Sequence, residues 1–330
     1  MSVFAAPTIT IDSRVSGESP STIGDDVRAG LGHGPPYRLA PKYFYDERGS
    51  ELFDQITELP EYYPTRAERA ILNRHAPAIV ERTGARELVE LGSGSASKTR
   101  ALLYAMAGAG RLERYVPVDV SRVPVERCAD ELTELYPGLE VHGLIGDFER
   151  DLVHLPRGER RLVAFLGGTI GNFDPEHRAS FLATLRSLLG PTDWLVVGTD
   201  LVKDAGVLQR AYDDSAGVTA AFDLNVLTVL NRELDGDFDI SAWEHVARWN
   251  AEDSWIEMRL RALRDQRVSL PGASLEVDFK AGDEIRTEIS AKFTRERIES
   301  ELAAADMRLV EMFTDPDGLF ALSLAAPRLR

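Results

Sequence analysis

A glycine-containing turn directly after a short apolar segment is the feature of this sequence that points most clearly to chemistry. Residues 87–91 have the apolar character of a buried strand, and Gly92 and Gly94 follow at once. Such a turn lets backbone N–H groups approach a ligand closely at the carboxyl end of a parallel strand. A second apolar segment, 114–118, ends in Asp119, and its distance from the turn is close to the ~20 residues that place a carboxylate on a ribose diol.

The ligand predicted by this turn is an adenosine that carries no pyrophosphate. The third glycine of a dinucleotide-binding fingerprint is absent, because Ser97 occupies that position. This absence disfavours a nicotinamide-dependent oxidoreductase. S-adenosylmethionine contains an adenosine without a pyrophosphate and is therefore the cofactor that we predict.

Alternating strands and helices are predicted to position these residues. The strand candidates are the apolar segments 87–91, 114–118, 140–145, 162–166 and 194–199. Helices between them are expected to begin near Ser97, Pro124 and Asp174. This alternation is typical of an α/β protein with a doubly wound parallel sheet, in which ligands bind at the carboxyl ends of the strands.

The pattern changes after Lys203. Residues 211–230 are predicted to be one helix, and period-two alternation then predicts antiparallel strands at 243–249, 254–263, 274–278 and 283–291. The chain returns to α/β character with a helix at 294–305 and strands at 308–314 and 320–324. A terminal helix followed by a hairpin is the usual ending of an S-adenosylmethionine-dependent methyltransferase sheet.

Two domains follow from this organisation. We expect a Rossmann-like methyltransferase domain at 66–202 plus 291–330, and an inserted α+β substrate-binding domain at 1–65 plus 203–290.

The composition limits the kinds of substrate and partner that the protein can bind. The 330 residues carry 38 Lys and Arg against 54 Asp and Glu, a formal net charge of −16, with no basic stripe, which disfavours nucleic acid as a substrate.

Cys128 is the only cysteine, so no intramolecular disulfide is possible, and we expect it to be buried. The sequence shows no secretory signal and no apolar run that would span a membrane. We expect a cytoplasmic monomer.

Several runs together resemble the histidine-specific Nα-methyltransferase family of ergothioneine biosynthesis, which lies within a larger group that also methylates indole amino acids. These runs occupy residues 42–46, 52–65, 90–94, 168–172, 198–204, 211–222 and 256–262. The resemblance extends from about Asp25 to the end of the chain, and its most specific parts are 52–65 and 211–222.

The resemblance implies two sets of site residues. The cofactor would be bound by Gly92, Lys98, Asp119, Asp147 and Phe148. The amino-acid substrate would be bound by Tyr62, Asn172, Tyr212, Met258, Glu288 and Ser290, and Tyr45 and Asn172 would act in catalysis.

The residue types suit these roles. A carboxylate at Asp119 can accept hydrogen bonds from both ribose hydroxyls, although a helix-capping acid is an alternative. Asp147 would accept from the adenine amino group while Phe148 covers the ring. Lys98 would pair with the methionine carboxylate, although a solvated lysine on a helix is an alternative. The amide of Asn172 offers donors and an acceptor to the substrate amine and carboxylate.

The clearest indication of substrate comes from residues 284–290. Alternation along a strand places Glu288 and Ser290 on one face and Thr287 and Ile289 on the other. A neutral imidazole has one donor and one acceptor nitrogen, which a carboxylate beside a hydroxyl can satisfy, whereas an indole has only a donor. A solvated antiparallel face is the alternative interpretation of this segment taken alone.

The resemblance therefore implies transfer of three methyl groups from S-adenosylmethionine to the α-amine of L-histidine, giving hercynine. The reaction needs no metal, and Tyr45 is the residue expected to orient the amine and handle its proton. An N-methyltransferase for another amino acid, such as an indole amino acid, and a non-catalytic S-adenosylmethionine-binding protein are the alternatives.

Overall fold

The computed structural model describes residues 8–14, 22–94 and 96–328, and the chain divides into two compact units. The first comprises Met1–Glu18, Arg66–Leu201 and Phe293–Arg330, and the second comprises Ser19–Thr65 and Val202–Lys292. The second unit is thus inserted in the chain of the first, and each is described here by itself.

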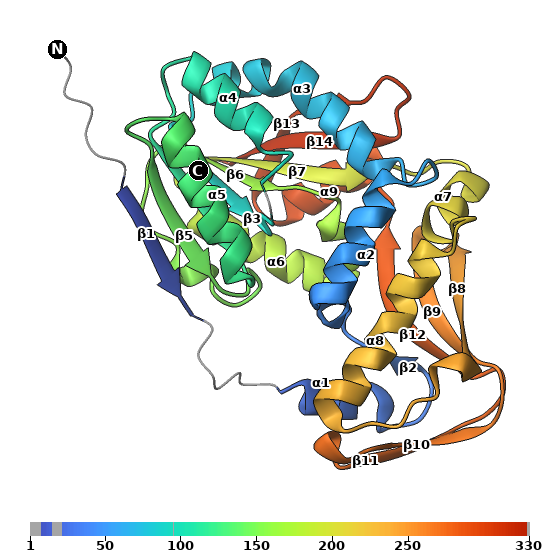
Figure 1. Ribbon diagram of the computed structural model, residues 1–330. Coiled ribbons are helices and arrows are strands. Elements are labelled where there is room, and N and C mark those ends of the chain that lie inside the picture. The colour runs from blue at the N-terminus through green and yellow to red at the C-terminus, as the bar shows by residue number, and fades with distance from the viewer. Residues whose placement is uncertain (1–7, 15–21, 95, 329–330) are drawn as a thin grey trace. The chain divides into compact units, whose positions relative to one another are not determined.

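The first unit is built on one eight-stranded sheet (Figure 1). In spatial order its strands are β1 (Thr8–Ser13), β5 (Glu140–Ile145), β4 (Arg114–Asp119), β3 (Glu87–Leu91), β6 (Arg161–Phe165), β7 (Trp194–Asp200), β14 (Phe320–Pro327) and β13 (Met307–Thr314). The strands from β1 to β7 are parallel, whereas β14 and β13 are antiparallel additions at one edge. This is the Rossmann-like sheet with a terminal hairpin that the sequence predicts.

Helices cover both faces of this sheet (Figure 1). On one face lie α3 (Pro64–Thr83), α4 (Arg100–Gly108) and α5 (Arg122–Leu135), which share an apolar core with the strands. The buried Cys128 belongs to this core, as predicted. Helix α6 (Pro175–Leu188) packs Phe181 against Phe165 on the opposite face, and a salt bridge of 2.7 Å from Arg178 to Glu301 joins it to α9 (Arg295–Ala304). The short helical turns η2 (Leu152–His154) and η3 (Thr169–Asn172) complete the unit.

The structure differs from the prediction at the N-terminus. Strand β1 pairs in parallel with β5, so Thr8–Ser13 belong to the sheet of the first unit and not to the substrate-binding unit predicted for residues 1–65. The segment is too short for its apolar pattern to indicate a strand. It forms a strand by pairing with the edge of an existing sheet. Residues 1–7 lie outside the described part of the chain.

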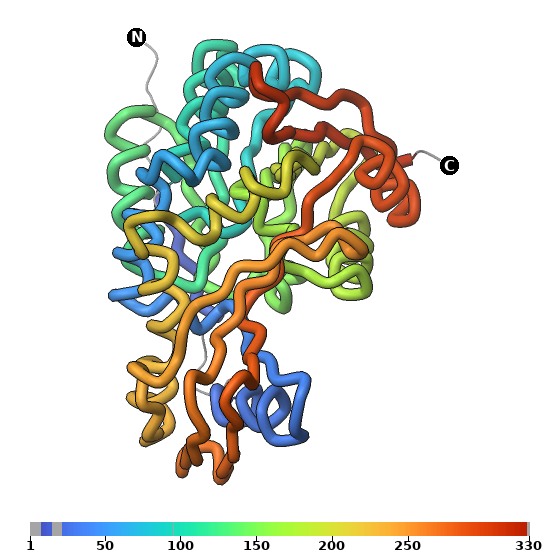
Figure 2. Tube along the Cα trace, turned by 90° about the vertical axis from the view of Figure 1, so that its right-hand side faces the viewer, coloured from blue at the N-terminus to red at the C-terminus, as the bar shows by residue number. Residues whose placement is uncertain are grey.

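The second unit combines helices with a sheet in which the three long strands are antiparallel and a short fourth strand pairs in parallel (Figure 2). Its four-stranded sheet has the order β2 (Tyr37–Arg38), β12 (Glu284–Ala291), β9 (Trp255–Ala262) and β8 (Trp243–Asn250). Strands β10 (Gln266–Leu270) and β11 (Leu275–Phe279) form a separate pair. The helical segments are α1 (Ile23–Leu31), η1 (Pro41–Phe44), α2 (Glu47–Glu58), α7 (Ala205–Tyr212), α8 (Val218–Leu234), η4 (Ile240–Ala242) and η5 (Pro271–Ala273).

Two elements of this unit differ from the prediction. The single helix predicted at 211–230 is interrupted, because Gly217 adopts a left-handed conformation with φ +74° between α7 and α8. Asp214 accepts hydrogen bonds from the backbone N–H groups of Val218 and Thr219, at 3.0 and 2.7 Å, and so begins α8. Strand β10 was not predicted, because the turn signal at Pro271 and Gly272 masks the short strand before it.

Candidate functional site

The glycine turn after β3 has the backbone conformation that the sequence implies. Gly92 and Gly94 have φ values of +69° and +49°, a region that residues with a side chain rarely adopt. Asp119 at the end of β4 holds the turn, because its carboxylate accepts hydrogen bonds from Gly94 N at 2.8 Å and from Ser121 N at 2.9 Å. Each carboxylate oxygen has a second lone pair, so Asp119 retains acceptor capacity for a diol.

An aromatic ring lies beside this turn. A Cβ built on Gly92 would lie 3.6 Å from the Phe148 ring, which also packs against Phe165 with ring centroids 5.4 Å apart. The neighbouring Asp147 carboxylate accepts a hydrogen bond of 2.8 Å from Glu149 N and is partly exposed. Phe148 is thus fixed by packing, and Asp147 has a defined orientation at the start of the loop after β5.

Lys98 belongs to a partly buried ion pair. Its ammonium donates to the Glu68 carboxylate at 2.8 Å, and the Glu68 side chain is fully buried. Glu68 also accepts from the backbone N–H of Gly167, at 2.8 and 3.0 Å, in the loop that follows β6. Glu68 therefore connects Lys98 with this loop, a role that the sequence pattern did not reveal because the two residues are far apart in the chain.

Asn172 ends the turn η3 in the same loop and is half-buried. Asp174 caps α6 by accepting from His177 N at 2.9 Å, with Pro175 in the first helical turn. The start of α6 thus fixes the backbone two residues after Asn172.

The residues of the first unit fit S-adenosylmethionine. A Cβ built on Gly94 would meet no atom within 4 Å, so the turn is open to a ligand. Asp119 and Phe148 lie beside this turn, and the Lys98 ammonium lies by Gly167 in the loop after β6, so an anionic acceptor, an aromatic face and a cation are present of the kinds that a ribose, an adenine and a carboxylate require. Among the described residues, no group of three or more His, Cys, Asp or Glu side chains could hold a metal ion.

We expect Asp119→Ala to weaken S-adenosylmethionine binding about tenfold or more, because a charge-assisted hydrogen bond contributes on the order of 1.5–3 kcal/mol. Isothermal calorimetry measures the affinity. Asp130→Ala, at an exposed position of α5, is the matched control. Unchanged cofactor affinity in a folded Asp119→Ala protein would show that this carboxylate does not bind the ribose.

Aromatic side chains gather in the second unit around the residues assigned to the amino acid. The Tyr45 ring contacts Phe53 and Phe222, with centroids 5.6 and 5.7 Å apart. The Tyr62 ring contacts Phe53 and Tyr212, both at 6.3 Å. Three of the predicted residues, Tyr45, Tyr62 and Tyr212, therefore belong to one aromatic cluster.

A register shift in β12 determines which way Glu288 faces. Arg286 pairs with Arg259 of β9, but Glu288 pairs with Met258, so Thr287 is an extra residue at a bulge. After the bulge Glu288 and Ser290 lie on the same face, as predicted, opposite the buried positions Met258 and Ile256. Thr287 itself donates to the Met258 carbonyl at 3.1 Å.

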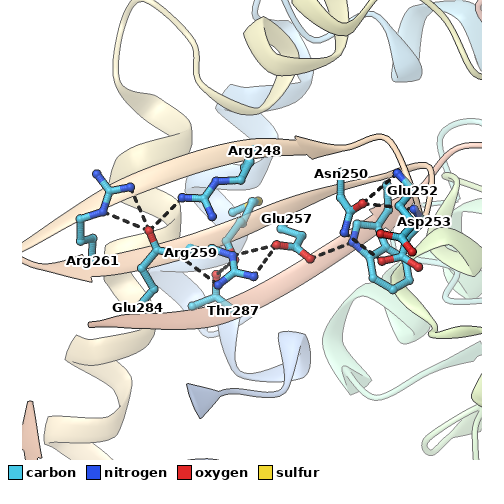
Figure 3. Close-up of polar contacts among 11 residues, drawn as sticks. Arg248, Asn250, Glu252, Asp253, Glu257, Arg259, Arg261, Glu284 and Thr287 are labelled. Atoms are coloured by element: carbon cyan, nitrogen blue, oxygen red, sulfur yellow. Dashed lines mark hydrogen bonds and ion pairs between the residues drawn. The ribbon is translucent and has the colours of Figure 1, made fainter. Parts of the chain in front are cut away.

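The opposite face of this sheet is a network of charges (Figure 3). Glu284 accepts hydrogen bonds from Arg261, Arg248 and Arg259, at 2.9, 3.1 and 3.1 Å, and Arg259 also contacts Glu257. Without the bulge, Glu288 would share this face with Glu284. The solvated-face interpretation thus describes Glu284, but not Glu288.

The Glu288 carboxyl has an unusual environment. Burial, and then the negative charge of Asp223, raise its pKa to about 8, although Lys292 acts in the opposite direction. Desolvation of the hydroxyl also raises the pKa of Tyr45, with Glu288 as the next cause, although 44% of the surface of this residue is exposed. The protonated form of each group is therefore favoured near neutral pH, and in that form each can donate a hydrogen bond.

Three polar residues near Tyr212 were not predicted. Lys292 is fully buried and donates to the hydroxyls of Ser290 and Tyr212, at 2.7 and 2.9 Å. The His245 ring contacts the Asp223 carboxylate at 2.6 Å and the backbone carbonyl of Tyr212 at 2.8 Å. Both ring nitrogens thus face acceptors, and Asp223 raises the pKa of His245 against the opposing effect of burial. This pair holds the end of α7 in place.

The raised pKa of Glu288 predicts a pH-dependent stability. Folded Glu288 holds its proton more tightly than the unfolded chain, so its contribution is complete below pH 4.5 and is lost as the pH rises to about 8. Glu288→Gln should remove this loss, so the melting temperature of the variant minus that of the wild type should rise between pH 5 and pH 9.

Glu284→Gln is the matched control, since the hydrogen bond from Arg261 and nearby arginine charges lower the pKa of Glu284 despite its burial. The Glu284→Gln protein should be less stable than the wild type across the whole of the same pH range. A difference between Glu288→Gln and wild type that stays constant with pH would contradict the assigned environment.

Comparison with known proteins agrees with this geometry. The family model described as histidine-specific methyltransferase, SAM-dependent, matches residues 23–327. The chain is 54% identical to a histidine N-alpha-methyltransferase of Mycolicibacterium smegmatis, covering 91% of this chain and 93% of that protein. It is 52% identical to the protein of the same name from Mycobacterium tuberculosis, covering 91% and 94%.

A third relative is the ergothioneine biosynthesis protein 1 of Neurospora crassa, which is 32% identical over 84% of this chain and 32% of its own length. The chain thus spans about a third of that protein. No described helix is long and apolar enough to cross a membrane. With a family model that matches nearly the whole chain, the protein belongs to the S-adenosylmethionine-dependent, histidine-specific methyltransferases.

Proposed function

We propose that this protein transfers three methyl groups from S-adenosylmethionine to the α-amine of L-histidine and releases hercynine, a step of ergothioneine biosynthesis. The observation that carries the proposal is the pair of Glu288 and Ser290 on one face of β12, beside the aromatic cluster. Family membership and the two bacterial relatives support the same substrate.

Recognition of the imidazole requires one acceptor and one donor. Glu288 would accept the ring N–H, which its carbonyl oxygen can do even while the group is protonated. The Ser290 hydroxyl would donate to the second ring nitrogen, and Met258, with 2% of its surface exposed, would form the apolar wall. An indole would satisfy only half of this arrangement.

The backbone of the amino acid would be held by Asn172, Tyr62 and Tyr212. When bound, S-adenosylmethionine supplies a methyl group on a sulfonium that is already a good leaving group. The chain has to bind the amine in its neutral form and align it with that methyl group. Tyr45 would orient the amine through its neutral hydroxyl and pass the amine proton to water, because its raised pKa disfavours a phenolate base.

Repeated transfer produces a quaternary ammonium that can no longer donate hydrogen bonds. The faces of Tyr45, Phe53, Tyr62 and Phe222 supply aromatic surface that tolerates a growing cation. This supports three rounds of methylation rather than one.

The principal alternative is another amino-acid N-methyltransferase, such as one for an indole amino acid, and a non-catalytic S-adenosylmethionine-binding protein is a further one. Incubation of the purified protein with methyl-labelled S-adenosylmethionine and each of the twenty amino acids separates them. We expect label transfer to histidine alone. Transfer to tryptophan, or to none of the twenty, would favour the respective alternative.

A further inference from the structure

One carboxylate beside the proposed catalytic tyrosine joins two helices of the second unit. Asp46 follows Tyr45 directly and begins α2, because its Oδ1 accepts a hydrogen bond of 2.8 Å from Gly49 N. The same oxygen accepts from the Asn225 side chain at 2.8 Å, and Oδ2 accepts from Arg232 at 2.8 Å. Asn225 and Arg232 belong to α8 and lie about two turns apart, so Asp46 connects the start of α2 to one face of α8.

The backbone around Tyr45 forms a tight turn. Tyr45 has φ −97° and ψ 46° and separates η1 from the start of α2. A Cβ built on Gly49 would lie 1.6 Å from the Phe44 carbonyl oxygen, so the first turn of α2 packs directly against the residue before Tyr45. Any side chain at position 49 would force these two segments apart. The chain from 44 to 49 therefore holds Tyr45 between two close contacts.

The Tyr45 side chain lies against both helices that Asp46 joins. Its ring contacts Phe53 of α2 and Phe222 of α8, with centroids 5.6 and 5.7 Å away. Phe222 precedes Asn225 by three residues, so the two side chains are neighbours on the surface of α8. The position of the Tyr45 hydroxyl thus depends on how α2 and α8 are held together, and Asp46 supplies a polar contact between them at the adjacent position.

We propose that Asp46 is a positioning residue for methyl transfer, which places the Tyr45 hydroxyl by anchoring the adjoining backbone to α2 and α8. This inference rests on the proposed function, in which Tyr45 orients the substrate amine. A misplaced hydroxyl lowers the rate of the chemical step. Binding of the imidazole through Glu288 and Ser290, on β12, should change little.

The hydrogen bonds of Asp46 matter more for this role than its charge. Burial acts to raise the pKa of this carboxyl, but hydrogen bonds from Arg232, Gly49 and Asn225 outweigh it and hold the pKa below its usual value. The Arg232 side chain is 52% exposed, and an ion pair with such a partner contributes little. An asparagine at position 46 keeps an Oδ1 for Gly49 and Asn225, while Arg232 can turn to solvent.

The experiment measures the single-turnover rate constant for methylation of L-histidine and the dissociation constant of histidine, the latter by calorimetry with S-adenosylhomocysteine present. Asp46→Ala should lower the rate constant about tenfold or more and change the dissociation constant by less than about threefold. Asp46→Asn should restore most of the rate, and Arg232→Met should retain it.

A double-mutant cycle separates the positioning of Tyr45 from a general loss of structure. In Tyr45→Phe the hydroxyl is absent, so the addition of Asp46→Ala should lower the rate constant much less than it does in the wild type. Thr22→Ala is the matched control in the same unit, because it removes the side-chain cap of α1, where Thr22 accepts from Asp25 N at 3.2 Å. It should lower the melting temperature and leave the rate constant unchanged.

Two results would overturn the inference: a folded Asp46→Ala protein with the wild-type rate constant, or an equal effect of Asp46→Ala in the wild type and in Tyr45→Phe. Where Asp46→Ala does not fold, Asn225→Ala takes its place in the same cycle, because it removes only the hydrogen bond to α8 and leaves the cap of α2. A wild type that transfers no methyl group to histidine would instead refute the proposed function.

Discussion

Glu288→Ala is expected to lower the affinity for L-histidine steeply and to reduce the preference for histidine over tryptophan. The substitution leaves the ring N–H of bound histidine without its acceptor among partly buried side chains, which costs roughly 1–3 kcal/mol. The space released beside Met258 also favours a larger apolar ring. Histidine binding should therefore fall by about tenfold or more, whereas tryptophan should be rejected less than before.

The measurement is the binding of histidine and tryptophan to the wild type and the variant, with S-adenosylhomocysteine present. Glu284→Ala is the matched control, because Glu284 lies on the same strand but on the charged face seen in Figure 3. A Glu288→Ala protein that keeps the wild-type ratio of the two affinities would place ring recognition elsewhere.

Asn172→Ala is expected to reduce histidine methylation by ~100-fold or more, with much less effect on S-adenosylmethionine binding. The substitution removes the amide that would anchor the amine, and a small misplacement of reacting groups can cost ~100-fold in rate. Single-turnover kinetics measure the chemical step, and calorimetry measures cofactor affinity.

Asn250→Ala is the control for this substitution, since the Asn250 side chain forms hydrogen bonds within the turn after β8, including one to Asp253 at 2.8 Å. Full turnover in Asn172→Ala would show that the amine is bound by other residues. A parallel loss of cofactor affinity would instead assign Asn172 to the cofactor.

The parallel sheet could be predicted because its strands are short apolar runs with functional groups at their ends. Strands β3 and β5 have the predicted bounds, β4 and β7 are each one residue longer at the carboxyl end, and β6 is shifted by one residue. A strand that is buried on both faces leaves a continuous apolar signal, which a single sequence shows well. The terminal hairpin was equally clear, because the Asp315–Gly318 turn separates two apolar strands.

The details of the second unit could not be predicted in the same way. Alternation suggested the shared face of Glu288 and Ser290, but only the bulge at Thr287 turns that face away from the charges around Glu284. Lys292 gave no signal either, since a lysine at a strand end is usually solvated. Its contact with Tyr212 joins residues from α7 and the end of β12, which only the tertiary structure brings together.

The central claim is tested most directly by the mass and the methylation position of the product formed from L-histidine and excess S-adenosylmethionine. We expect mass spectrometry to show products with one, two and finally three added methyl groups, and fragmentation to place all three on the α-nitrogen. A final product with fewer than three methyl groups, or with a methyl group on the imidazole ring, would contradict the account.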